Sequence, residues 1–248
     1  MALELPEEIQ AYYRDREVVA RYLERRTAQP LNGALHQAQV RWLQQRIRER
    51  APRCVVEIAP GPARLTAEVA VPGIGVGFEF SETMLATART RVGADSRWRF
   101  VRSDAFRLPV AAEVADFVFS LRFVRRFHLE DRQRLYREIH RVLRPGGALA
   151  LDAQNRAVAL PHRQERGLER YPVYDQLYDE RELRREIEAA GFRVVIVQGM
   201  IKHFSLQRRL NRLRRLKLDW IARALIETLE YVPGNSPSSW MLLAEKLV

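Results

Sequence analysis

From residue 54 onward, short apolar runs alternate with amphipathic segments, and this alternation constrains the fold more than any other feature of the sequence. The runs lie at 54–59, 75–80, 98–103, 115–120, 147–153 and 192–198. Because they are apolar on both faces and are separated by helical segments, they predict strands of a mostly parallel sheet that is covered on both sides. The predicted fold class is a doubly wound α/β domain.

The segments between and after these runs have helical periodicity and recognisable ends. Residues 130–143 stop at Pro145-Gly146-Gly147, and residues 179–190 stop at Gly191. A longer helical segment is expected at 205–231, with Leu206 and Trp220 on its apolar side. The chain then ends in a last predicted strand, WMLLAEKLV.

Residues before 54 have a different pattern. They predict helices at 8–26 and 35–50, with the sequence TAQPLNG as a loop between them, and no strand. We therefore divide the chain into an N-terminal helical cap, 1–52, and a main domain, 53–248. In this division 205–231 is a helical insertion before the last strand.

Composition excludes several classes of protein. Cys54 is the only cysteine among 248 residues, which excludes an internal disulfide and a cysteine-based metal cluster. The five histidines have no ligand spacing, so no metal site is predicted. No apolar run approaches the roughly 20 residues that a transmembrane helix needs, and the N-terminus lacks the pattern of a signal peptide. A cytoplasmic protein is expected.

Basic residues exceed acidic ones and give a formal net charge of +11. Part of the excess is concentrated at 208–217, RRLNRLRRLK, which has six cations and no acid. Such a stripe is typical of a solvated helix face, of a peripheral contact with an anionic membrane surface, or of a contact with nucleic acid. The sequence leaves these alternatives open, as it does the oligomeric state.

Candidate ligand-binding residues follow the first three predicted strands, because ligands bind at the carboxyl ends of strands in open α/β sheets. After the first strand, small residues let a ligand approach the backbone, and Pro62 is expected to keep Gly61 extended. After the second, the Glu79 carboxylate can accept hydrogen bonds from both hydroxyls of a ribose. After the third, Asp104 can accept from an exocyclic amine such as adenine N6. These residues predict a nucleoside ligand.

At these positions the sequence resembles the class I S-adenosylmethionine-dependent methyltransferases, in particular those of ubiquinone, menaquinone and small-molecule type. Four segments resemble the first four motifs of the family: VVEIAPGPARLT, GFEFSETML, SDAFRLPV and ADFVFSL. Three more resemble the stretches around its last three strands: LYREIHRVLRPGGALAL, EIEAAGFRVV and PSSWMLLAEK. The resemblance implies a seven-stranded, Rossmann-like sheet with an antiparallel last strand, and N-terminal helices that close over the cofactor.

The resemblance also implies which residues hold the cofactor, S-adenosylmethionine. It places Ala59, Gly61 and Ala63 at the methionine end, Glu79 at the ribose, Met84, Asp104 and Ala105 at the adenine, and Ser120 at the floor of the site. Glu57, Pro60 and Phe80 are further candidate cofactor-binding residues. Ala59 and Ala63 stand where the family has glycine. Each adds a methyl group toward the cofactor and disfavours a positive φ.

Basic and aromatic residues are expected on the side of the site that faces the methyl acceptor. The candidate substrate-binding residues are Tyr13, Arg122, Arg125 and Arg156. The arginines suit a carboxylate or phosphate, but those after the fourth strand can instead pair with Glu130 and Asp131, and the tyrosine can pack against the core. His128 is the candidate catalytic base, with a plain surface position as the alternative.

The predicted function is S-adenosylmethionine-dependent methyl transfer to oxygen, nitrogen or carbon of a small-molecule acceptor, anionic or lipid-like in character. One alternative is a methyltransferase that acts on RNA or protein through the basic surface. The other is a non-catalytic module that keeps the fold, which the two alanines favour.

Overall fold

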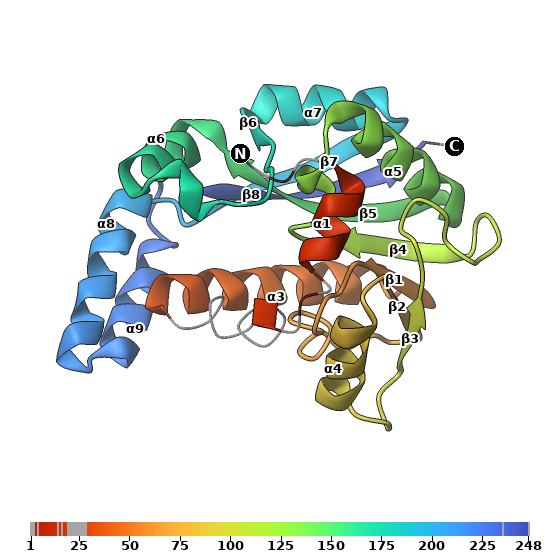
Figure 1. Ribbon diagram of the computed structural model, residues 1–248, viewed down its shortest axis with the longest axis horizontal. Helices are drawn as coiled ribbons and strands as arrows, with labels where there is room; N and C mark the ends of the chain where they lie inside the picture. Colours follow the sequence, from red (N-terminus) through yellow and green to blue (C-terminus); the bar gives the residue numbers. More distant parts are fainter. Residues whose placement is uncertain are drawn as a thin grey trace.

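A single twisted sheet forms the centre of the computed structural model, which describes residues 3, 5–13, 15, 17, 18, 29–234 and 236–247. The strand order is β3-β2-β1-β4-β5-β8-β7 (Figure 1). The strands are β1 Cys54–Ile58, β2 Ile74–Glu79, β3 Trp98–Arg102, β4 Ala115–Ser120, β5 Leu143–Asn155, β7 Phe192–Met200 and β8 Ser239–Lys246. β8 runs antiparallel between β5 and β7, and the others from β3 to β5 are parallel. The doubly wound, mostly parallel sheet with an antiparallel last strand is confirmed.

The sheet has one strand more than the seven predicted. β6, Leu177–Tyr178, pairs in parallel with the end of β5 beside the main order. It is too short to give a periodic signal in the sequence. β5 also begins earlier than expected, because the strand continues directly from α5 and includes the Pro-Gly-Gly sequence at 145–147.

Helices cover both faces of the sheet (Figure 1). They are α1 Pro6–Tyr12, α3 Pro30–Arg50, α4 Glu82–Val92, α5 Leu129–Val142, α6 Arg156–Arg166, α7 Glu180–Ala189, α8 Phe204–Leu210 and α9 Asp219–Leu229, with short 3-10 helices η1 Val124–Arg126, η2 Leu168–Arg170 and η3 Asn211–Leu216. Leu43 and Ile47 of α3 pack with Val55 on one face. Ile139 of α5 and Val56 belong to the core on the other face. Adjacent residues of one strand therefore enter different cores, which explains the continuous apolar runs.

The N-terminal segment differs from its prediction in two places. α3 begins at Pro30, so PLNG belongs to the helix and not to a loop, because proline is well tolerated in the first turn of a helix. α1 begins at Pro6 and ends at Tyr12, and the rest of the helix predicted at 8–26 lies partly outside the described residues, which omit 19–28. α3, which belongs to the predicted N-terminal cap, packs on the sheet of the main domain. The division of the chain into a cap, 1–52, and a main domain, 53–248, therefore stays a prediction.

The helical segment predicted at 205–231 is divided in the structure into α8, η3 and α9. Lys217 has φ +56°, a left-handed conformation that ends η3 and turns the chain back into α9. α8 and α9 pack against each other on either side of this turn. The apolar residues before and after the turn therefore do not follow one helical periodicity. Leu206 and Trp220, expected on the apolar side, are 49% and 72% exposed.

The described residues lack the helices needed to span a membrane and the side-chain groups needed to hold a metal ion. No helix among them has the length and apolar character needed to cross a bilayer. They contain no group of three or more histidine, cysteine or acidic side chains placed to hold a metal ion.

Candidate functional site

A pocket of about 820 Å³ lies at the carboxyl ends of the strands from β1 to β4. This volume includes space that is open to solvent. Nine of the residues selected from the sequence line it: Tyr13, Ala59, Gly61, Glu79, Phe80, Met84, Asp104, Ala105 and Arg122. The structure therefore brings together side chains from four successive strand ends and from the N-terminal segment.

The turn after β1 has an alternating left-handed backbone. The φ angles of Ala59, Gly61 and Ala63 are +55°, +58° and +56°. The expectation that Pro62 keeps Gly61 extended is therefore wrong. A left-handed conformation costs alanine about 1 kcal/mol more than glycine, because its Cβ approaches the backbone. The strain predicted from the two alanines is thus present at both positions.

The two alanines differ in where their methyl groups lie. Ala59 lines the pocket, whereas Ala63 is fully buried beneath the turn, so only the first adds a methyl group toward a ligand. At Gly61 an added methyl group would lie 3.8 Å from the sulfur of Met84. Residues 61–68 form a series of turns and no α-helix.

Glu79 connects the ends of β1 and β2. One oxygen, Oε2, accepts a hydrogen bond from the Gly61 amide at 3.0 Å, and the other, Oε1, accepts from the Ser81 amide at 2.8 Å. The residue is 8% exposed and lines the pocket. Burial raises the pKa of Glu79, while these backbone hydrogen bonds oppose the shift. Each oxygen retains capacity to accept a further hydrogen bond from a ligand hydroxyl.

Glu57 lies beneath the turn and not in the pocket. Its carboxyl accepts a hydrogen bond from the hydroxyl of Thr66, and it is 3% exposed. Burial raises the pKa of Glu57 to about 8, although Thr66 and Arg64 act in the opposite direction. The structure therefore gives Glu57 a part in holding the turn in place of the direct cofactor contact expected.

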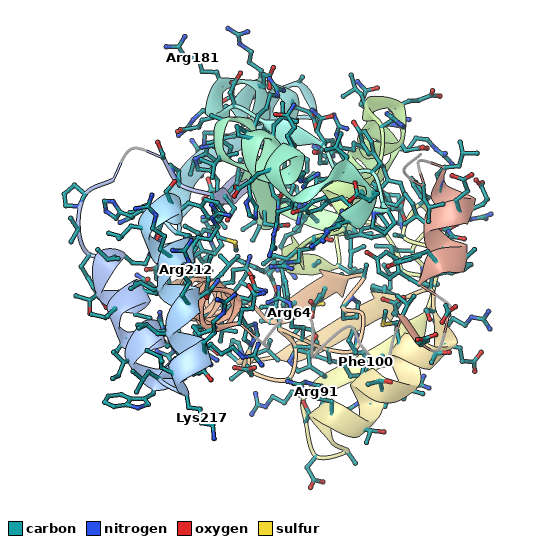
Figure 2. The ribbon with its side chains drawn as sticks, turned by 60° about the vertical axis from the view of Figure 1, so that its left-hand side comes forward. Arg64, Arg91, Phe100, Arg181, Arg212 and Lys217 are labelled. Atoms are coloured by element: carbon teal, nitrogen blue, oxygen red, sulfur yellow. The ribbon has the colours of Figure 1, made fainter. Side chains whose placement is uncertain are left out.

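Arg64, next in sequence to Ala63, ties the same turn to α3. It is buried in the interior (Figure 2), where it lies 2.7 Å from Nδ1 of His36 and donates to Gln39 at 3.0 Å. Nε2 of His36 in turn lies 2.7 Å from Glu68. The turn after β1 is therefore fixed from below by a buried polar network that sequence reasoning missed.

The adenine side of the pocket combines an acid with apolar walls. Asp104 is exposed at the rim, and its Oδ1 accepts from the Phe106 amide at 2.9 Å, so its carboxylate also forms a local turn. Met84 and Phe80 form part of the wall. Ser120 donates its hydroxyl to the Ile58 carbonyl at 2.9 Å and joins β4 to β1, below the pocket.

A second, more polar cavity adjoins the first, and Tyr13 and Arg126 line both. Arg125 lies in its wall, 3% exposed, where it pairs with Asp175 and lies 3.4 Å from Asp152. The alternative pairing with Glu130 and Asp131 is therefore wrong, and both real partners come from distant segments. Since two buried acids hold the guanidinium, the direct substrate contact predicted for Arg125 is not available without breaking these pairs.

Asp175, in the wall of the second cavity, lies within ion-pair distance of three arginines. Besides Arg125 it pairs with Arg163 and lies 3.6 Å from Arg126. Burial alone would raise the pKa of Asp175, but the three cations outweigh it and lower the pKa to about 2. The cavity wall therefore keeps a negative centre surrounded by positive charge throughout the physiological pH range.

Two predicted residues lie away from both cavities. His128 is exposed at the start of α5 and stacks on Tyr174, with ring centroids 4.1 Å apart. Arg156 begins α6 and pairs with Glu182 of α7. The structure thus does not bring the predicted base or this arginine to the pocket.

Several pocket residues were not selected from the sequence. The aromatic rings of Phe106, Phe123 and Phe127 form a cluster with centroids 5.0 and 5.5 Å apart, and Ile9 and Leu121 extend the apolar wall. For Phe123 and Phe127, the available signal in the sequence was the segment LRFVRRF, which places aromatic and basic residues next to each other directly after β4.

Comparison with known proteins relates part of the chain to methyltransferases. Residues 56–151 match the family model described as a methyltransferase domain. Residues 56–151 therefore resemble a methyltransferase domain, and they make up less than half of the chain. An S-adenosylmethionine-dependent methyltransferase of Thermotoga maritima has the same fold, with a TM-score of 0.63 and 20% identity over 95% of this chain and 99% of that one.

Two curated relatives match this domain in part. Methyltransferase GfsG of Streptomyces halstedii is 38% identical over 78 residues, which are 30% of this chain and 27% of that protein. Demethylmenaquinone methyltransferase of Clavibacter sepedonicus is 36% identical over 98 residues, 39% of each chain. The chain therefore matches less than half the length of these relatives.

The left-handed backbone at Ala59 predicts that glycine stabilises the fold. We expect Ala59→Gly to raise the free energy of unfolding in urea by about 1 kcal/mol. Ala51→Gly is the matched control, because Ala51 has φ +44° at the end of α3, and it should give a similar gain. A loss of stability in Ala59→Gly would contradict the account of backbone strain.

The raised pKa of Glu57 predicts a pH-dependent loss of stability. Between pH 4.5, its ordinary value, and about pH 8, the unfolded chain releases this proton and the folded chain keeps it. Stability should therefore fall as pH rises through this window, by a contribution on the order of 4 kcal/mol.

Glu57→Gln removes this contribution. Its unfolding free energy, measured in urea at pH values from 4 to 8, should match that of the wild type at pH 4 and exceed it at pH 8. Parallel stability curves for the two proteins would show that Glu57 is ionised in the folded state.

Proposed function

We propose that this chain transfers a methyl group from S-adenosylmethionine to a small-molecule acceptor. The observation that carries the proposal is the position of Glu79, a buried carboxylate that lines the pocket at the end of β2. The pocket suits an adenosyl group that lies across three strand ends. Its walls are apolar, Gly61 has no side chain to obstruct a ligand, and Asp104 supplies an acid. Bound there, the sulfonium would supply an electrophilic methyl group.

In this proposal, different pocket residues contact the ribose, the adenine and the methionine end of the cofactor. Glu79 accepts from the ribose hydroxyls, and Asp104 with Ala105 and Met84 contacts the adenine. The backbone at Ala59 and Gly61 contacts the methionine end, since both residues line the pocket. Glu57, Pro60, Ala63 and Ser120 do not line the pocket, so the proposal gives them no direct contact with the cofactor.

The adjoining cavity is proposed as the acceptor site. Arg125, Arg126 and Arg163 carry three positive charges against two acids, Asp152 and Asp175, so one positive charge is left in a wall that is largely buried. A carboxylate or phosphate on the acceptor would compensate it. Tyr13 lines both cavities and so lies between cofactor and acceptor.

The proposal assigns no catalytic base. His128 lies outside both cavities, and alignment of donor and acceptor can by itself supply roughly 7–11 kcal/mol of the barrier. An acceptor that is already anionic at the reacting atom needs no proton removed. A polymer acceptor has less support, because the basic stripe at 208–217 lines neither cavity.

Removing the charge of Glu79 tests the cofactor site. We expect calorimetry to show S-adenosylhomocysteine binding to the wild type and binding weakened about 10- to 100-fold in Glu79→Gln, since charge-assisted hydrogen bonds to the ribose are lost. Glu82→Gln, a neighbouring exposed acid, is the control and should bind as the wild type does. Equal affinities for all three proteins would contradict the proposed role.

A labelling experiment tests the acceptor class. With methyl-labelled S-adenosylmethionine and separate metabolite, RNA and protein fractions, label should enter only the metabolites. Arg163→Gln should raise the KM for that acceptor about tenfold and leave S-adenosylhomocysteine affinity unchanged, because Arg163 lines only the second cavity. Label in RNA or protein would favour the polymer alternative, and no label with intact cofactor binding would favour a non-catalytic module.

A further inference from the structure

The helices α8, η3 and α9 form a helical hairpin, residues 204–229, that is anchored to the fold on one side. Ile226 packs with Leu31 and Ala34 of α3 in a small separate core. Asn211 accepts a hydrogen bond from the Leu31 amide at 3.0 Å and so caps the start of α3. The hairpin is therefore held in a defined position beside the first turns of α3 (Figure 1).

The turn that joins the two arms of the hairpin exposes large apolar side chains. Leu216 is 67% exposed and Trp220 is 72% exposed, and Leu225 on the following turns is 44% exposed. Single exposed apolar residues are common on protein surfaces, but an exposed group of this size on one projecting element is typical of an interaction site. The other tryptophans, Trp42, Trp98 and Trp240, are at most 6% exposed.

Exposed basic side chains lie on the same hairpin as these apolar side chains. Arg208 pairs with Glu165, but within the described residues Arg209, Arg212, Arg214, Arg215 and Lys217 are exposed and form no ion pair. Asp219 is the one acid between 209 and 220. Figure 2 shows Lys217 at the outer end of the hairpin, on the opposite side of the molecule from Arg181.

We propose that the hairpin turn docks on an anionic lipid bilayer, with Leu216 and Trp220 entering the interface and the cations contacting the headgroups. Leucine and tryptophan beside arginine and lysine are the side chains that interfacial helices use, because the apolar groups leave water while the cations meet anionic lipid. Nucleic acid would engage the same cations but offers no comparable place for Leu216. The exposed apolar residues therefore favour the membrane among the alternatives for this stripe.

Co-sedimentation with vesicles tests the proposal on the full chain. The wild type should bind vesicles of equal parts phosphatidylglycerol and phosphatidylcholine, bind phosphatidylcholine alone weakly, and lose binding as salt is raised. Arg214→Gln/Arg215→Gln/Lys217→Gln should weaken binding on the order of 100-fold. Arg137→Gln/Arg181→Gln/Arg185→Gln, an equal change of charge at exposed positions elsewhere, should retain most of it.

Tryptophan fluorescence gives a second readout at the turn itself. Emission should shift to shorter wavelength on anionic vesicles, because Trp220 is the exposed tryptophan, and Trp220→Phe should abolish the shift while it retains binding. Leu216→Ser/Trp220→Ser should weaken binding about tenfold, with circular dichroism showing an intact fold. Equal losses in the two charge variants, an unshifted emission, or RNA binding that needs the cations but not Leu216 and Trp220 would overturn the proposal.

Discussion

The hydrogen bonds from the Gly61 and Ser81 amides to the two oxygens of Glu79 are the interaction on which the site depends. They join the loop after β1 to the end of β2 and hold a carboxylate at the surface of the pocket. Without a partner, a buried carboxylate of this kind would cost several kcal/mol. The same two amides therefore stabilise the fold and present the charge that a ribose would meet.

The turn after β1 is the strained part of this arrangement. Ala59 and Ala63 adopt the left-handed conformation that glycine adopts without penalty. Glu57 beneath the turn and Arg64 beside it supply the contacts that oppose this strain, through Thr66, His36 and Gln39. A rigid turn loses little conformational entropy when a ligand binds, so strain in the unbound state is compatible with a working site.

Local patterns in the sequence predicted the strands well. β4 begins and ends where the apolar run at 115–120 does, and Glu79 and Asp104 lie in the pocket because carboxyl ends of parallel strands share one edge of the sheet. Interactions between distant segments were not predictable in this way. Asp152 and Asp175, which hold Arg125, come from a strand and a loop far along the chain. The break at Lys217 likewise depends on packing of both arms against α3, which the helical periodicity of 205–231 does not contain.

The proposed function requires an adenosyl group to lie across the ends of β1, β2 and β3, with Glu79 at its ribose. A crystal structure with S-adenosylhomocysteine tests this most directly. Both ribose hydroxyls should lie within hydrogen-bond distance of the Glu79 carboxylate, and the adenine should lie between Met84 and Asp104. A ligand bound elsewhere, or a pocket closed by the methyl group of Ala59 with Glu79 turned away, would contradict it.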